Sequence, residues 1–162
     1  AAEASGVPVA RLAEPFDTVS FCLSKGLGAP VGSLVCTERA RIREVLRGRK
    51  ILGGGMRQAG VLAAAGLYAL EHHIERLRDD HANARHLAAG LRALGLGVES
   101  EPETNIVMFR VHDAAKFAQG TRERGLLINP FDSKRFRAVT HLDVSERDID
   151  DALERIEASL AN

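Results

Sequence analysis

Residues 21–32 have the sequence FCLSKGLGAPVG, in which Lys25 ends an apolar run and is followed by glycines. The run from Val19 to Leu23 predicts a short buried strand. The glycines and Pro30 that come after it predict a close-fitting loop rather than a helix. A lysine held at the rigid end of a strand is a candidate Schiff-base nucleophile. The same spacing also suits a surface lysine in a turn.

A second glycine-rich segment, LRGRKILGGGMRQAG at residues 46–60, runs into an alanine-rich stretch at residues 61–70. The three consecutive glycines, residues 53–55, predict the start of a helix whose free backbone N–H groups and dipole would attract an anion. In the first turn of that helix, Arg57 would add a bidentate donor for phosphate. A flexible turn with an incidental arginine fits this segment equally well.

Three motifs resemble those of the low-specificity L-threonine aldolases, which are pyridoxal-phosphate enzymes of the aspartate-aminotransferase fold type. They are SKGLGAPVG (residues 24–32), LGGGMRQAG (residues 52–60) and RAVTHLDV (residues 137–144), in the family's order and at about the family's spacing. The resemblance covers essentially the whole chain, whereas family members are considerably longer. It implies an α/β fold: the C-terminal part of a transferase-like large domain that binds pyridoxal 5′-phosphate, then a small α+β lobe with a mainly antiparallel sheet.

Length and composition fit one domain, or a domain with an added lobe. The chain has 162 residues, 45% of them hydrophobic, and its 22 basic side chains balance 22 acidic ones, so no basic surface for nucleic acid is expected. No apolar run approaches the ~18–20 residues of a membrane span, and residues 1–9 lack the basic start of a signal peptide. Cys22 and Cys36 lie in apolar contexts and are interpreted as buried thiols of a reducing compartment, so we expect a cytoplasmic protein.

Three regions are expected along the chain. Residues 1–70 would be the C-terminal part of the large cofactor domain with the Schiff-base lysine, residues 71–94 a long connecting helix, and residues 95–162 a small α+β domain. Apolar residues three, four or seven apart predict the helix at 71–94, and glycines end it. The remaining expected elements are strands at 19–23, 33–36, 97–100, 106–111, 126–129 and 136–142, and helices at 38–47, 113–124 and after Ser145. The sequence opens without Met, as though at the end of a helix, so we expect the C-terminal part of a longer polypeptide.

The resemblance assigns roles to particular residues. Lys25 matches the lysine that forms the imine with the cofactor, whose pyridine ring then serves as an electron sink. Arg57 matches an arginine that contacts the cofactor phosphate across a subunit interface, which implies a homodimer or homotetramer. Lys50 matches a basic residue of the same region and is a further candidate for substrate binding, although a solvated helix-end charge fits nearly as well. Arg137 matches the arginine that grips the substrate α-carboxylate with its planar fork, and a solvent-facing edge charge is the alternative.

Other polar residues receive plainer interpretations. His141 lies near Arg137 and is a candidate base, although a packed or hydrogen-bonded histidine is favoured. The four histidines at 72, 73, 81 and 86 lack the i, i+4 spacing of a helical metal site, so no metal is expected. Asp79 and Asp80 are expected on a solvated helix face.

The reaction implied by the resemblance is reversible aldol cleavage of a β-hydroxy-α-amino acid, such as L-threonine or L-allo-threonine, to glycine and an aldehyde. One alternative is a β-eliminating lyase of the same fold type, which would form a keto acid and ammonia. Another is a non-catalytic fragment that keeps only packing and dimer surfaces. Upstream motifs of the family are missing from this sequence: an earlier phosphate-binding segment, a ring-stacking histidine and an aspartate for the pyridine nitrogen. The isolated chain is therefore expected to be inactive.

Overall fold

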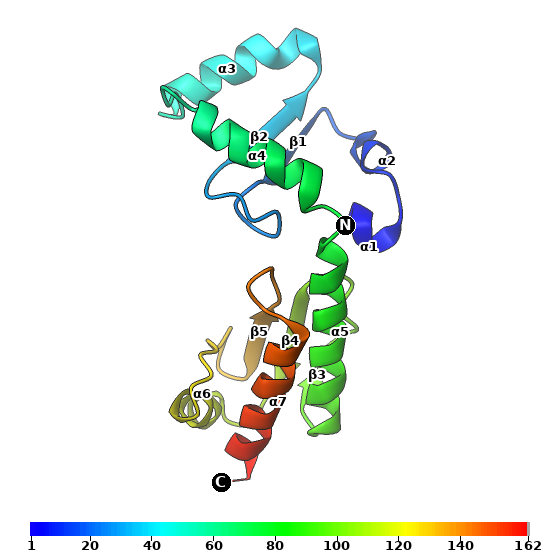
Figure 1. Ribbon diagram of the computed structural model, residues 1–162, viewed down its shortest axis with the longest axis vertical. Coiled ribbons are helices and arrows are strands. Elements are labelled where there is room, and N and C mark those ends of the chain that lie inside the picture. The colour runs from blue at the N-terminus through cyan, green and yellow to red at the C-terminus, as the bar shows by residue number, and fades with distance from the viewer. Residues whose placement is uncertain (162) are drawn as a thin grey trace. The chain divides into compact units, whose positions relative to one another are not determined.

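The computed structural model describes residues 1–161. The chain forms two compact units, an N-terminal unit of Ala2–Leu77 and a C-terminal unit that begins at Arg78. In Figure 1 the N-terminal unit runs from blue to green and the C-terminal unit from green to red. Each unit has a small antiparallel sheet of its own, with helices packed beside it.

The N-terminal unit is built around a hairpin of two strands. Strand β1 (Thr18–Cys22) pairs with β2 (Ser33–Thr37), and Cys22 lies opposite Ser33. The expected glycine-rich loop, residues 23–32, connects the two strands. The helices of the unit are α1 (Ala2–Ser5), α2 (Val9–Ala13), the 3-10 turn η1 (Arg39–Arg41), α3 (Ile42–Ile51) and α4 (Gly60–His72).

The core of this unit is small and lies under the hairpin loop. Leu23, Ala29 and Ala69 are its buried members. Gly66 lets α4 approach the loop, because a Cβ at this position would lie only 2.9 Å from Cδ1 of Leu23. The loop after β1 and the helix α4 therefore form one packed element.

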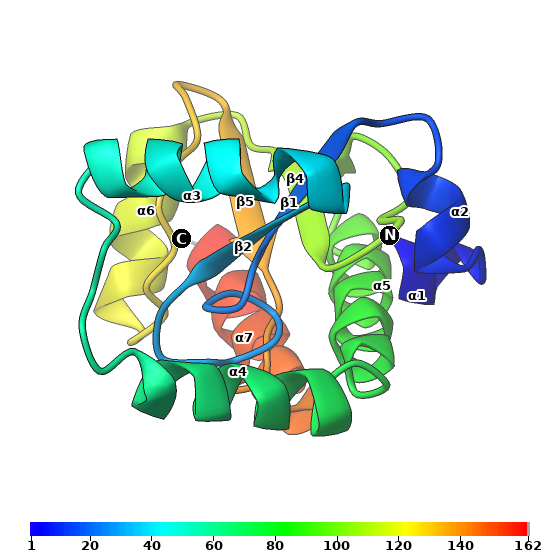
Figure 2. The same ribbon diagram turned by 90° about the horizontal axis from the view of Figure 1, so that it is seen from above.

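The C-terminal unit has a three-stranded antiparallel sheet in the order β3 (Gly97–Val98), β4 (Ile106–Arg110), β5 (Arg135–Val139). Its helices are α5 (Leu77–Ala93), α6 (Ala114–Glu123) and α7 (Glu146–Leu160), and Figure 2 shows α7 lying between α6 and α5. Phe109 and Phe136 stack at 5.6 Å on one face of the sheet, and Phe117 of α6 meets both edge-on. On the strands these buried residues alternate with outward ones, such as Arg110 and Arg137.

Local capping explains where two of these helices begin. Asp113 accepts hydrogen bonds from the backbone N–H groups of Ala115 and Lys116, both at 3.0 Å, and starts α6. Ser145 and Asp148 form the expected capping box of α7. The hydrogen bonds donated by the Ser145 hydroxyl and backbone N–H lower the pKa of the Asp148 carboxyl.

Several expectations about the elements were wrong. The single helix expected at residues 71–94 is broken, because α4 ends at His72 and α5 begins at Leu77. Residues 126–129 form no strand; only Pro130 makes an isolated bridge, to Phe136. Cys36, expected to be buried, is exposed.

Within the described residues, no helix has the length and apolar character that crossing a membrane requires.

Candidate functional site

Lys25 lies in the turn that directly follows β1. Its carbonyl oxygen accepts a hydrogen bond of 2.8 Å from Gly28 N–H, and the positive φ of Gly28, 71°, suits glycine at this point. Leu23 N–H donates to Gly32 and Ala29 N–H donates to Leu23, which closes the loop on itself. The Lys25 side chain is exposed, and it makes no hydrogen bond or ion pair within the part of the chain that the structure describes. The loop thus presents a free ε-amino group on a defined backbone.

The triple glycine has a different role from the one expected. Gly53 N–H and Gly54 N–H donate to the carbonyls of Lys50 and Arg49, so these glycines close the end of α3. Because those N–H groups are already bonded, they do not form the expected anion cradle. The next helix begins only at Gly60, and Arg57 lies in an exposed turn before it rather than in its first turn.

Lys50 folds back over this turn. A Cβ built on Gly55 would lie 2.9 Å from Cδ of Lys50 and 3.1 Å from its Nζ, so the absence of a side chain at Gly55 makes room for the lysine. Neither Lys50 nor Arg57 has a hydrogen-bond or ion-pair partner among the described side chains. The N-terminal unit therefore carries three unpaired cations at the expected positions, Lys25, Lys50 and Arg57.

Arg137 belongs to the C-terminal unit. It lies opposite Met108 in the sheet, is exposed, and lines a cavity of about 600 Å³ beside the edge strand β5. Apolar side chains, such as those of Phe131, Leu127 and Val139, form most of the cavity wall, and His141 also lines it. Arg137 has no hydrogen-bond or ion-pair partner within residues 1–161.

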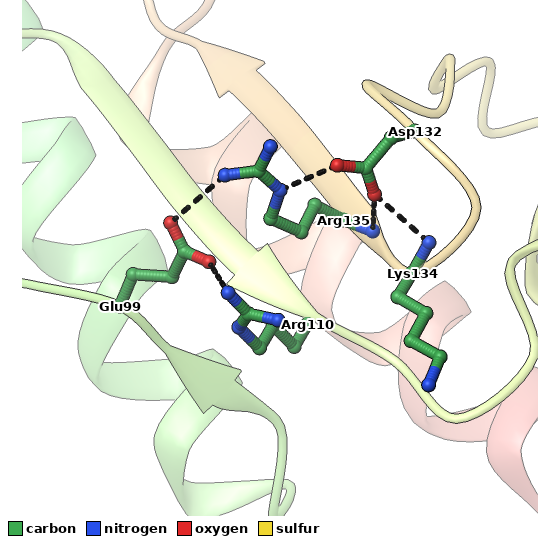
Figure 3. A network of polar contacts seen from close by, with 5 residues as sticks. All are labelled: Glu99, Arg110, Asp132, Lys134 and Arg135. Atoms are coloured by element: carbon green, nitrogen blue, oxygen red, sulfur yellow. Dashed lines mark hydrogen bonds and ion pairs between the residues drawn. The ribbon is translucent and has the colours of Figure 1, made fainter.

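A polar network at the start of β5 distinguishes Arg135 from Arg137. Glu99 forms ion pairs with Arg110, at 2.8 Å, and with Arg135, at 3.9 Å, while Nε of Arg135 donates to Asp132 at 2.6 Å (Figure 3). Asp132 also accepts the backbone N–H groups of Lys134 and Arg135, both at 2.9 Å. The network pairs two arginines with two carboxylates and leaves the neighbouring Arg137 as an unpaired cation.

The electrostatic consequences in this network are mutual. The backbone N–H of Lys134 and then the guanidinium of Arg135 lower the pKa of the Asp132 carboxyl. Asp132 in turn raises the pKa of the Arg135 guanidinium. The Arg135 guanidinium also lies over the Phe131 ring, 5.0 Å from its centroid, which fixes the turn before β5 at the rim of the cavity.

The remaining candidates are mostly structural. His141 is half-buried and its Nδ1 accepts a hydrogen bond of 3.3 Å from Asp143 N–H, as favoured for a hydrogen-bonded histidine. Asp80 is 1% exposed, so its expected place on a solvated face was wrong. Within the described residues, no group of His, Cys, Asp and Glu side chains could hold a metal ion.

Sequence reasoning missed His73. Its Nδ1 lies 2.6 Å from the carbonyl oxygen of Leu27, in the loop of Lys25. No local sequence signal predicts this contact, because the two residues are 46 positions apart. Only the packing of α4 against the loop brings them together.

Comparison with known proteins gives the family. The model of the beta-eliminating lyase family matches residues 1–114. This chain belongs to that family. It is 42% identical over 160 residues to the low specificity L-threonine aldolase of Escherichia coli K12, covering 98% of this chain and 47% of the relative. It is also 42% identical to a probable low-specificity L-threonine aldolase of Arabidopsis thaliana, covering 93% of this chain and 44% of the relative.

Solved structures agree on the fold. A putative aromatic amino acid beta-eliminating lyase/threonine aldolase from Exiguobacterium has a TM-score of 0.79 at 18% identity, covering 98% of this chain and 49% of that one. Serine palmitoyltransferase of Sphingomonas wittichii has a TM-score of 0.74 at 24% identity, covering 93% of this chain and 41% of that one. These likenesses confirm the expected α/β fold. The chain spans about half the length of the curated relatives it matches.

Proposed function

We propose that this chain contributes the C-terminal part of a lyase that uses pyridoxal 5′-phosphate to cleave β-hydroxy-α-amino acids. The relatives named L-threonine aldolases support this substrate class, with L-threonine or L-allo-threonine giving glycine and acetaldehyde. The observation that carries the proposal is the free side chain of Lys25 at a closed, defined turn after β1.

The residues present fit the functional groups of the cofactor. An aldehyde needs an amine, which Lys25 offers, and a phosphate needs cations, which Arg57 and Lys50 offer without competing partners in the described chain. Lys50 is kept as a candidate for either phosphate or substrate. When bound, the pyridine ring supplies an electron sink for charge developed at the substrate α-carbon.

Arg137 would bind the substrate, through its α-carboxylate. Its guanidinium can fix two carboxylate oxygens in one plane, and this orients the Cα–Cβ bond. In the cleavage, a base takes the β-hydroxyl proton, the Cα–Cβ bond breaks as the aldehyde forms, and the α-carbon gains a proton to give glycine. Within this chain, Arg137 would hold the substrate while these bonds change.

We further propose that residues 1–70 complete a large cofactor domain, that residues 71–94 connect it to a small domain at 95–162, and that the enzyme is a cytoplasmic homodimer or homotetramer. These proposals concern a family-length protein, in which this chain follows an N-terminal half of the kind that the longer relatives carry. Without that half, the isolated chain would lack turnover.

Product analysis tests the proposed reaction. The family-length protein, supplied with pyridoxal 5′-phosphate and L-threonine or L-allo-threonine, should release glycine and acetaldehyde in equal amounts. Lys25→Ala is the control, and it should abolish release. Formation of a keto acid and ammonia instead would assign the chain to β-elimination, and no product from any β-hydroxy-α-amino acid would favour a non-catalytic role.

A further inference from the structure

The two carbonyl groups that follow Lys25 are both bonded to the segment between α4 and α5. Nδ1 of His73 contacts the carbonyl oxygen of Leu27 at 2.6 Å, and Nη1 of Arg76 donates to the carbonyl oxygen of Gly26 at 3.5 Å. Because a carbonyl oxygen only accepts, the hydrogen of the first contact must be on Nδ1 of His73. The backbone on the C-terminal side of Lys25 is therefore tied at two successive residues.

His73 is itself held in place from several sides. Its backbone N–H donates to Ala69 at 2.9 Å, and the ring of Tyr68 meets its imidazole edge-on at 5.5 Å. The side chain is half-buried, so its hydrogen bond to Leu27 is partly protected from water. A fixed donor of this kind restrains its acceptor more than a mobile surface residue would.

The loop needs such a restraint because its own sequence is permissive. Three glycines lie between residues 26 and 32, and glycine allows many backbone conformations. Packing at Gly26 adds to the restraint, since a Cβ there would lie 3.0 Å from Cδ2 of Leu77. The break between α4 and α5 places His73, Arg76 and Leu77 against the same short stretch.

We propose that His73, assisted by Arg76, is a positioning residue for Lys25. By holding the Leu27 carbonyl it fixes the turn from which the ε-amino group of Lys25 extends toward the cofactor aldehyde. The role of Lys25 as the cofactor-binding amine rests on the proposed function, whereas the contact between His73 and the Leu27 carbonyl does not depend on it.

The chain offers a matched control in the preceding residue. His72 lies on α4 with its ring 4.3 Å from that of Tyr68, and its side chain makes no hydrogen bond within the described residues. His72→Ala therefore removes an imidazole from the same helix end without releasing the loop. His73→Asn provides the rescue, because the amide nitrogen of asparagine can replace Nδ1 as the donor.

The first measurement is amide hydrogen exchange in the family-length protein. His73→Ala should speed exchange of the Gly28 and Ala29 amides on the order of fivefold, which corresponds to losing one hydrogen bond of ordinary strength. His72→Ala and His73→Asn should leave this exchange near that of the wild type. Unchanged exchange in His73→Ala, or equal acceleration throughout β1 and α4, would overturn the proposal.

The second measurement follows how fast the ε-amino group of Lys25 reacts with the cofactor aldehyde. Pyridoxal 5′-phosphate is added, the protein is reduced with borohydride at timed intervals, and the pyridoxyl label on Lys25 is counted by peptide mapping. His73→Ala should slow labelling by a similar factor, and His73→Asn should restore it. Normal labelling on a loosened loop would refute positioning. Absence of label on Lys25 in the wild type would count against the proposed function, while hydrogen exchange would still decide the contact.

Discussion

Arg135 and Arg137 show how two arginines on the same strand acquire different availability. Asp132 and Glu99 pair with Arg135, whereas Arg137, two residues further along β5, has no partner in the described chain. An unpaired guanidinium beside an apolar cavity can bind an incoming carboxylate without first breaking an ion pair. The polar network therefore supports the proposal that Arg137, rather than Arg135, binds the substrate carboxylate.

Replacing Arg137 tests this assignment. Each hydrogen bond to a charged group contributes roughly 1.5–3 kcal/mol, so Arg137→Ala in the family-length protein should lower kcat/KM at least about tenfold. Arg137→Lys should recover only part, because an ammonium lacks the planar fork. Steady-state kinetics with L-threonine measure both, and Arg122→Ala on α6 is an exposed control. Lost cofactor binding with unchanged kinetics in occupied sites would move Arg137 away from the substrate.

The Asp132 carboxyl should titrate below the ordinary aspartate value of about 3.9. Since its folded pKa is lowered, its contribution to stability is fully present above that ordinary value and is lost as pH falls through the folded pKa. Arg135→Gln should raise the pKa only partly, because the backbone N–H of Lys134 is the larger cause. Carboxyl NMR titration measures it. An unshifted pKa in the wild type would show that the polar network around Asp132 does not persist in solution.

At the scale of elements, periodicity and capping predicted most helices and strands. The features that the sequence did not predict depend on contacts between residues far apart in the chain. Local signals were sufficient for the positions of β1, β2, β4 and α6, although β1, which was expected to be buried, has no buried residue. No glycine or proline marks the break after His72. It lies where His73 and Arg76 bond the distant loop of Lys25, a contact that no local signal predicts. Asp80 was misjudged for a related reason: Thr140, the residue that follows β5, contacts its helix face, and the Thr140 hydroxyl donates to the Asp80 carbonyl at 2.6 Å.

The candidate site shows the same difference between local signals and long-range contacts. Residues 21–32 were sufficient to predict the turn that carries Lys25, because the glycines and proline there act locally. The place of Arg57 was wrong by about one helical turn, since the three glycines could start a helix or end one. That choice depended on hydrogen bonds back to Arg49 and Lys50, which the glycine pattern alone does not reveal.

The capping box of α7 supplies a prediction for one element. The Ser145 hydroxyl accepts the Asp148 N–H at 3.3 Å, so Ser145→Ala should reduce the free energy of unfolding by about 1 kcal/mol. Urea unfolding followed by circular dichroism measures this loss. The exposed Ser100, which makes no side-chain hydrogen bond among the described residues, provides the control Ser100→Ala. Equal stability of the two variants would indicate that the start of α7 is frayed.

At the scale of the whole molecule, the expected site residues are divided between the two units. Lys25, Lys50 and Arg57 belong to the N-terminal unit, and Arg137 belongs to the C-terminal unit. Several apolar side chains of the N-terminal unit are exposed in this chain, among them Val61 and Leu67 of α4. Such surfaces suit contact with further protein, in keeping with the proposed family-length oligomer.

Mixed oligomers test whether Arg57 serves a neighbouring subunit. Family-length Arg57→Ala and Lys25→Ala subunits should each be inactive or nearly so. When they are combined, a hybrid can pair an intact Lys25 with an intact Arg57, so part of the activity should return. Threonine cleavage before and after mixing measures this, with mass spectrometry establishing that hybrids form. No recovery in proven hybrids would place both residues in the same subunit's site.

Among the proposed roles, that of Lys25 as the residue that binds the cofactor covalently is the one on which the others depend. The decisive measurement is borohydride reduction of the family-length protein with pyridoxal 5′-phosphate, followed by peptide mapping of the wild type and of Lys25→Ala. We predict one pyridoxyl group on the peptide that contains Lys25, and none on Lys25→Ala while its fold remains intact. A label on Lys50 in the wild type, or an undiminished label on Lys25→Ala, would contradict this role of Lys25.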